Sequence, residues 1–244
     1  MFQKSWIYNT SISALKNREK YIEENADIIN WKQISRRWKI ATLDFDLINK
    51  FREEFDWEVI TEKQKLSEAF MREFKKHLSW PLVSKHQKLS ESFIDEFSEL
   101  LDWDYLWINQ DISESFIERH IDKADWPSIS FYQRLSEEFI RKHEYSVDWS
   151  RIWVGQQHMS EDFIEEFVDN VDWDIVSATQ HLSEDFIRRN RKFVAWEEIS
   201  NSQKLSEPFI EEFRNKVHWE SIFNFQDLSE EFKEKHKKMR PKER

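Results

Sequence analysis

Three kinds of side chain recur along the sequence and have chemistry that a functional site could use. Glutamine amides can read base edges, histidine pairs can bind a metal, and paired carboxylates can act as general acid and base. The glutamines are the most regular of the three, because each stands three residues before a serine. They are Gln64, Gln87, Gln110, Gln133, Gln157, Gln180, Gln203 and Gln226.

The glutamines are interpreted as structural because the same residue is present in every copy. In a code that reads one nucleotide per unit, the contact residues differ from unit to unit. An invariant amide can instead cap a neighbouring helix end or form a ladder between stacked units, since it carries two donors and an acceptor. The sequence therefore favours a role in folding over base recognition.

The histidines occur as pairs at matching positions of adjacent copies. His120 and His143 form one such pair, and His158 and His181 form another. Two histidines do not make a metal site without further ligands. Their placement suits the C-terminal ends of helices, where positive character is favourable. No metal site is predicted, although stacking of the copies would bring each pair close together.

The carboxylates give no stronger signal for catalysis. Acid pairs such as Glu165-Glu166 recur as surface residues of predicted helices. The chain has no cysteine and no glycine-rich phosphate loop, and no nucleophile–base pair stands apart from the repeated pattern. The sequence predicts a protein that is not an enzyme and that has no cofactor.

A tandem repeat of 23 residues explains these regular spacings. Counted from its tryptophan, the unit reads W-x-x-I-S-x-x-Q-x-L-S-E-x-F-I-x-x-F-x-x-x-V-D. One step is 24 residues long, and the extra residue is placed between Trp149 and Gln157, beside Gly155. The repeated tryptophans are Trp57, Trp80, Trp103, Trp126, Trp149, Trp173, Trp196 and Trp219. The repeated serines are Ser67, Ser90, Ser113, Ser136, Ser160, Ser183, Ser206 and Ser229.

Each unit is predicted to form two short helices. The residue before the tryptophan, often Asp as at Asp102 and Asp125, is a good N-cap for the first helix. The serine is the N-cap of the second helix, and the glutamate after it lies near the positive end of the helix dipole. Phe93, Ile94 and Phe97 form an apolar stripe on the second helix. The Trp and Phe stripes are expected to form the core.

One unit has too few apolar residues to fold alone, so neighbouring units must stack. The predicted fold is an all-α solenoid of about eight two-helix repeats, elongated or superhelical. Residues 57–232 hold the tandem repeats, and residues 233–244 form a basic C-terminal tail. Residues 1–56 are a divergent N-terminal cap with one degenerate repeat around Trp31, in which Trp38 replaces the glutamine and Asp44 replaces the serine.

The unit W-x-x-I-S-x-x-Q-x-L-S-E-x-F-I resembles short tryptophan/"LSExFI" helical repeats of bacteriophage and giant DNA virus proteins. The resemblance covers roughly residues 57–232, about three quarters of the chain. It implies an α-helical repeat protein of viral origin, and it implies no activity and no site residues. The chain shows neither a signal peptide nor a membrane span, so an intracellular location in the host cytoplasm is expected.

Binding should depend on positions that differ between copies. The slot that is usually Ser or Thr holds an aromatic residue three times, and the two positions before each glutamine vary most. Exposed aromatic patches commonly mark interaction sites. The alternative is that these side chains fill packing gaps or cover a kink at Gly155. The candidate partner-binding residues are Trp107, Ile108, Phe131, Tyr132, Trp153, Val154 and Phe223.

The net charge of −11 predicts repulsion from nucleic acid and from membranes. The tail 233–244 contributes +5, from seven Lys/Arg and two Asp/Glu, so the remainder carries −16. Direct nucleic-acid binding is therefore not expected, with the basic tail as the one segment that could contact nucleic acid. The first hypothesis for function is a protein–protein interaction scaffold. The alternatives are an acidic decoy that mimics nucleic acid to inhibit a host defence factor, and a self-assembling structural component.

Overall fold

The computed structural model describes residues 12–156 and 158–240, and all regular structure within these ranges is helical. The chain divides into two compact units, Met1–Ile112 and Ser113–Arg244. The tandem repeats continue through both units, each with a first helix that begins at the tryptophan and a second helix that begins after the serine. The predicted all-α solenoid of about eight repeats is confirmed.

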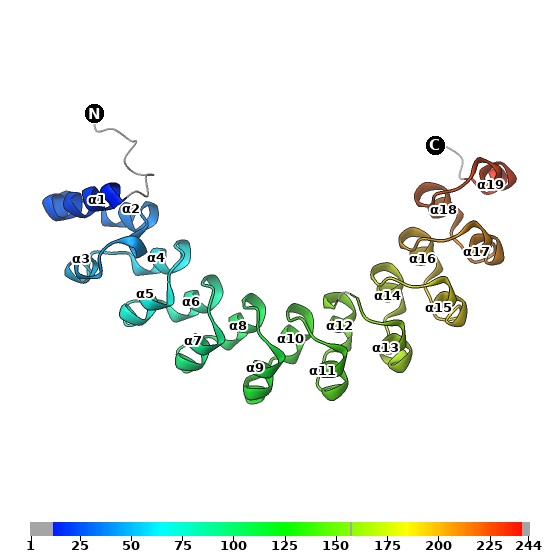
Figure 1. Ribbon diagram of the computed structural model, residues 1–244, viewed down its shortest axis with the longest axis horizontal. Helices are drawn as coiled ribbons and strands as arrows, with labels where there is room; N and C mark the ends of the chain where they lie inside the picture. Colours follow the sequence, from blue (N-terminus) through cyan, green and yellow to red (C-terminus); the bar gives the residue numbers. More distant parts are fainter. Residues whose placement is uncertain (1–11, 157, 241–244) are drawn as a thin grey trace. The chain divides into compact units, whose positions relative to one another are not determined.

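The helices of the first unit follow one another with short connections. They are α1 (Ile12–Asn25), η2 (Ala26–Ile28), α2 (Trp31–Arg37), η3 (Ile40–Thr42), α3 (Phe45–Lys50), α4 (Trp57–Lys63), α5 (Glu68–Glu73), α6 (Trp80–His86), α7 (Glu91–Glu96) and α8 (Trp103–Asn109). Within this unit the first helices α2, α4, α6 and α8 lie in one row, and the second helices α3, α5 and α7 lie in another (Figure 1).

The second unit repeats the same arrangement. Its helices are α9 (Glu114–Arg119), η4 (Ile121–Lys123), α10 (Trp126–Tyr132), α11 (Glu137–Lys142), α12 (Trp149–Gly155), α13 (Glu161–Glu166), η5 (Val168–Asn170), α14 (Trp173–Thr179), α15 (Glu184–Arg189), α16 (Trp196–Ser202), α17 (Glu207–Glu212), α18 (Trp219–Phe225), α19 (Glu230–Lys235) and η6 (Lys237–Met239). Adjacent first helices are in contact along α10, α12, α14, α16 and α18.

Capping residues set where the helices begin. Every repeat serine caps its second helix, as Ser90 does by accepting a hydrogen bond from the Phe93 N–H at 3.3 Å. Asp102 caps α8 in the same way, so these predictions are confirmed. Asp125 makes no side-chain capping bond. Pro127 stands in the first turn of that helix and removes one of the N–H groups that could donate.

The core lies between the two rows of helices in each unit. Phe93 and Ile94 of α7 are buried together with Leu106 of α8, and the equivalent residues are buried in the other repeats. Full burial of one such side chain contributes about 1.5–3 kcal/mol. The repeat tryptophans are only half-buried, unlike the expectation. Trp80 donates its indole N–H to the Lys75 carbonyl at 3.1 Å and stacks on Phe97, which closes the turn before α6.

The degenerate repeat around Trp31 contains the two helices α2 and α3. Asp44 replaces the serine and caps α3 through the N–H of Asp46 at 2.9 Å. With Trp38 in place of the glutamine, no amide reaches back from this repeat. Gln64 of the next repeat donates to the Ser35 carbonyl at 2.7 Å, but its buried side-chain oxygen has no partner. The amide network therefore starts incompletely at this end of the first unit.

Candidate functional site

The repeated glutamines join neighbouring repeats through their side-chain amides. Gln87 donates from Nε2 to the main-chain carbonyls of Thr61 and Gln64, both at 2.7 Å. Its Oε1 accepts from the N–H of Leu66 at 2.8 Å. Both amide hydrogens are therefore used within the fold, which leaves no donor for a base. The structural interpretation of these glutamines is confirmed.

The repeat alignment assigned one of the repeat glutamines to the wrong residue. Gln156, rather than Gln157, donates to the carbonyls of Ser130 and Gln133 at 3.0 and 2.7 Å. Gln156 stands seven residues after Trp149, the spacing of every other repeat, so the extra residue follows the glutamine. Gln157 itself lies outside the described residues. The backbone adjusts at His158, which has φ of 79°, and its N–H binds the Gln180 side chain.

The glutamate of each "LSE" element has a role that the sequence did not indicate. Glu68 accepts the main-chain N–H of Ser90 at 2.8 Å, 22 residues later, and Glu114 does the same for Ser136. This bond satisfies a backbone donor at the start of the next second helix. The glutamate is present in every repeat. This recurrence was the one sequence feature that could have indicated a bond between repeats. Equivalent bonds join Glu161 to Ser183, Glu184 to Ser206 and Glu207 to Ser229.

The small residue in the slot after the isoleucine also links repeats. Ser84 donates to the Trp80 carbonyl at 3.0 Å and accepts from the Asp102 N–H at 2.9 Å. Ser130 binds the Asp148 N–H in the same way. The glutamine and glutamate common to all repeats, and the serine where this slot holds one, are thus engaged between repeats. Partner recognition must be sought at positions that vary.

Trp107 and Trp153 occupy this same slot and are completely buried. Their predicted place on an exposed patch is wrong, because the slot points into the junction between first helices. Each lies four residues after a repeat tryptophan and contacts it, with ring centroids 5.8 Å apart for Trp149 and Trp153. Trp153 donates its indole N–H to the Asn170 carbonyl at 2.7 Å. Their burial fits the alternative interpretation, in which these rings fill space in the packed core.

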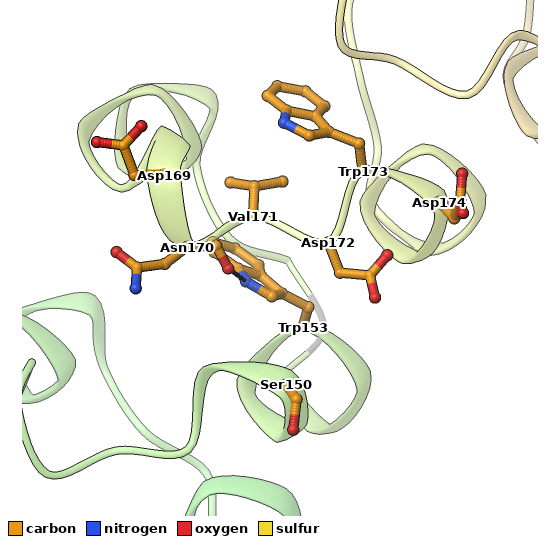
Figure 2. Close-up of a pocket in the computed structure, with 8 residues that line it drawn as sticks. All are labelled: Ser150, Trp153, Asp169, Asn170, Val171, Asp172, Trp173 and Asp174. Carbon is orange, nitrogen blue, oxygen red and sulfur yellow. Dashed lines mark hydrogen bonds between the residues drawn. The ribbon is translucent and has the colours of Figure 1, made fainter.

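Trp153 borders a shallow depression of about 450 Å³ between α12 and α14 (Figure 2). These two helices are in less extensive contact than the other adjacent first helices of the second unit. Asp169, Asp172 and Asp174 place carboxylates around the depression. Within the described ranges, no three His, Cys, Asp or Glu side chains are grouped so that they could hold a metal ion.

The remaining candidate residues differ in exposure. Tyr132 is 48% exposed and Val154 is 47% exposed, on the adjacent helices α10 and α12. Phe131 is half-buried and contacts Tyr132 edge-on, with ring centroids 4.8 Å apart. We call Phe131, Tyr132 and Val154 the apolar edge. Ile108, 39% exposed, belongs to the first unit, and Phe223 is half-buried on α18.

Gly155 explains why α10 and α12 come so close at the apolar edge. A Cβ atom at this position would lie 2.4 Å from the carbonyl oxygen of Phe131 and 2.7 Å from its Cα. Only glycine avoids this clash with backbone. Glycine is therefore required here by close packing. It is not required by the backbone conformation, because its φ is not positive. Its effect is to let α12 approach the Phe131 backbone of α10 closely.

Two of the paired histidines lie at helix C-terminal ends, as predicted, whereas His158 and His181 lie in the connections after α12 and α14. His120 and His143 are the C-terminal caps of α9 and α11. His143 Nε2 lies 2.8 Å from a Glu118 carboxylate oxygen that also accepts from Lys142 at 2.7 Å. These contacts lower the pKa of the Glu118 carboxyl, first through Lys142 and then through His143. His158 and His181 are both exposed.

Comparison with protein-family models, with curated proteins and with solved structures finds no match to this chain. In the described part of the chain, no helix combines the length and the apolar character needed to span a bilayer.

Proposed function

We propose that this chain is a non-enzymatic scaffold that binds a protein partner through the variable residues of its first helices. The observation that supports this proposal is that invariant and variable positions of the repeat have different roles. The invariant Gln and Glu side chains form bonds between repeats, whereas the two positions before each glutamine differ and include exposed apolar side chains.

The apolar edge is the part of this surface best suited to a protein partner. Tyr132 and Val154 lie on helices held together at Gly155, so the two side chains are presented by rigid neighbouring elements. A tyrosine offers apolar area together with a hydroxyl at little conformational cost, which is why it is enriched at interfaces. The viral origin implied by the sequence resemblance, and a partner from the host or the virus, remain predictions.

The acidic decoy has less support from the contacts. Several carboxylates of the second unit already bind groups of the same chain, as Glu161 binds the Ser183 N–H and Glu166 pairs with Arg141 at 2.7 Å. Such carboxylates are less available to imitate phosphates. The two hypotheses differ in salt response, because contacts between exposed charges are screened while apolar contacts persist.

The test compares affinity capture from cell lysate by three full-length chains, at low and high salt. One is the unmodified chain and one carries Tyr132→Ser with Val154→Ser. The matched control carries Tyr145→Ser with Ile121→Ser, which also removes one exposed tyrosine and one exposed aliphatic side chain from the second unit. We expect a protein that the unmodified and control chains retain at both salt concentrations and that the apolar-edge variant loses. Capture of the same proteins by all three chains would contradict the proposal.

A further inference from the structure

Exposed cations gather on the first helices of the first unit. They occupy α2, α4 and α6 and the connections that follow these helices, and Lys39, Lys65 and Lys88 stand at the same position of three consecutive repeats. We call them the basic strip. Its members are Lys32, Arg36, Arg37, Lys39, Lys63, Lys65, Lys85 and Lys88.

These cations have almost no carboxylate partners. Elsewhere in this unit, Arg72 binds Glu96 at 2.8 Å. Within the described residues, only Lys63 of the basic strip forms an ion pair, with the adjacent Glu62 at 2.5 Å. Lys85 instead lies over the Tyr105 ring, 5.2 Å from its centroid. The strip therefore carries positive charge that the fold does not neutralise.

Neighbouring repeats bring these cations together. The helix α4 packs between α2 and α6. Lys32, Arg36 and Arg37 of α2 line one shallow depression of about 450 Å³ together with Lys63 of α4. Further along, the pKa of the Glu62 carboxyl is lowered mainly by its hydrogen bond with Lys63, and the charges of His86 and Lys85 lower it further. Positive charge from three repeats thus acts on one surface.

We propose that the basic strip binds the phosphate backbone of a nucleic acid without sequence specificity. Three repeats at helix spacings of 8–10 Å span about 20 Å, which matches about six phosphates along one strand of a duplex. Arg and Lys side chains are the usual donors to such phosphates. An acidic protein fits less well, because the strip has no exposed aromatic anchor of the kind that protein interfaces use.

The net charge of the chain does not oppose this binding. Residues 1–112 contain 17 Lys/Arg and 20 Asp/Glu, a net charge of only −3, and the strip collects eight of those cations. The acidic residues of α2, α4 and α6 are Glu58 and Glu62 alone, and others of the same unit, such as Glu91, Asp95 and Glu96, lie on the second helix α7. Local potential at the surface, rather than the summed charge, governs where a polyanion binds.

The experiment measures fluorescence anisotropy of labelled DNA oligonucleotides, single-stranded and duplex, with the full-length chain over a range of salt concentrations. The strip variant carries Arg36→Gln, Arg37→Gln and Lys88→Gln, all exposed. The control carries Lys192→Gln, Lys204→Gln and Arg214→Gln, three exposed cations of the second unit. We expect the strip variant to bind at least about tenfold more weakly in low salt, and to lower the slope of log K against log salt by about two to three. The control should match the unmodified chain.

Two further measurements can overturn the proposal. A tail variant with Lys237→Gln, Lys238→Gln and Arg240→Gln should keep its affinity, whereas loss of binding in this variant alone would assign the DNA to the C-terminal tail. Poly-glutamate of equal charge should compete weakly. Equal competition would identify an acidic protein as the partner class, and absence of DNA binding even in low salt would also refute the strip.

Discussion

The side-chain amide of Gln87 donates a hydrogen bond to the main-chain carbonyl of Gln64, 23 residues earlier, at 2.7 Å. The same bond joins Gln203 to Gln180 and Gln226 to Gln203 in the second unit. One residue type thus satisfies the open end of a helix in the preceding repeat, where carbonyl groups have no partner within the helix. This relationship accounts for the invariance of the glutamine and leads to the first prediction.

Gln203→Met should destabilise the fold by about 2–4 kcal/mol. The substitution keeps the length of the side chain but removes its bonds to the carbonyls of Ser177 and Gln180 and to the N–H of Leu182. A buried polar group left without a partner costs about 1–3 kcal/mol. Urea unfolding followed by tryptophan fluorescence measures the change. Gln33→Met, at an exposed position, is the control and should be neutral within about 0.5 kcal/mol.

Gly155→Ala should destabilise the second unit by about 1–3 kcal/mol, as overpacking does. The added methyl group would lie 2.4 Å from the Phe131 carbonyl oxygen, so α10 and α12 must separate. Ser202→Ala tests the same position of α16, where the side chain is exposed, and should have little effect. Thermal unfolding followed by circular dichroism compares the two variants. A midpoint for Gly155→Ala equal to that of the unmodified chain would show that the helices do not approach this closely.

Trp153→Ala should destabilise by about 3–5 kcal/mol, the usual effect of deleting a buried aromatic side chain. The ring is fully buried and its N–H binds the Asn170 carbonyl. Tyr145→Ala removes a ring that is 96% exposed and should change stability by less than about 0.5 kcal/mol. Urea unfolding of both variants decides the matter. Similar free energies of unfolding for the two variants would contradict the burial of Trp153.

Much of this fold is predictable from the sequence because its determinants are local. Ser90 and Asp102 are capping residues that mark where α7 and α8 begin. Phe93 and Ile94 indicate which face of α7 is buried. Trp153 was misplaced because its slot was judged by residue type, whereas its spacing of four from Trp149 puts both rings on one helix face. The bond from Glu68 to Ser90 depends on how repeats stack, which no single helix reveals.

The candidate site is less predictable than the fold. The sequence shows which positions vary between repeats, and exposure in the structure separates Tyr132 and Val154 from the buried tryptophans. The sequence did not predict the basic strip, because the net charge of the chain is negative. The cations of the strip are also far apart in sequence and become neighbours only when the repeats stack. Charge summed along a chain contains no information about which face carries it.

Acid should weaken the second unit partly through Glu118. Its pKa is lowered in the folded chain, chiefly by the hydrogen bond with Lys142 and then by that with His143, from an ordinary value of 4.5. A carboxyl with a lowered folded pKa stabilises the fold above its unfolded pKa, and this contribution is lost as pH falls through the folded pKa. Glu118→Gln should therefore lower the melting temperature more at pH 7 than at about pH 3, because the stabilising carboxylate is progressively protonated as the pH falls through its folded pKa. An equal difference at both pH values would refute this assignment.

The central claim is that invariant side chains hold the repeats together, so that function lies in the residues that vary. Hydrogen–deuterium exchange in Gln87→Met tests it most directly, because the Leu66 N–H binds Gln87 Oε1 at 2.8 Å. We predict that the Leu66 amide exchanges at least about tenfold faster in this variant, since a lost bond of about 1.4 kcal/mol corresponds to that factor. The Leu205 amide, held by Gln226 in the second unit, should keep its rate. Unchanged protection at Leu66 would contradict the account, because the repeats would then be joined without the glutamine.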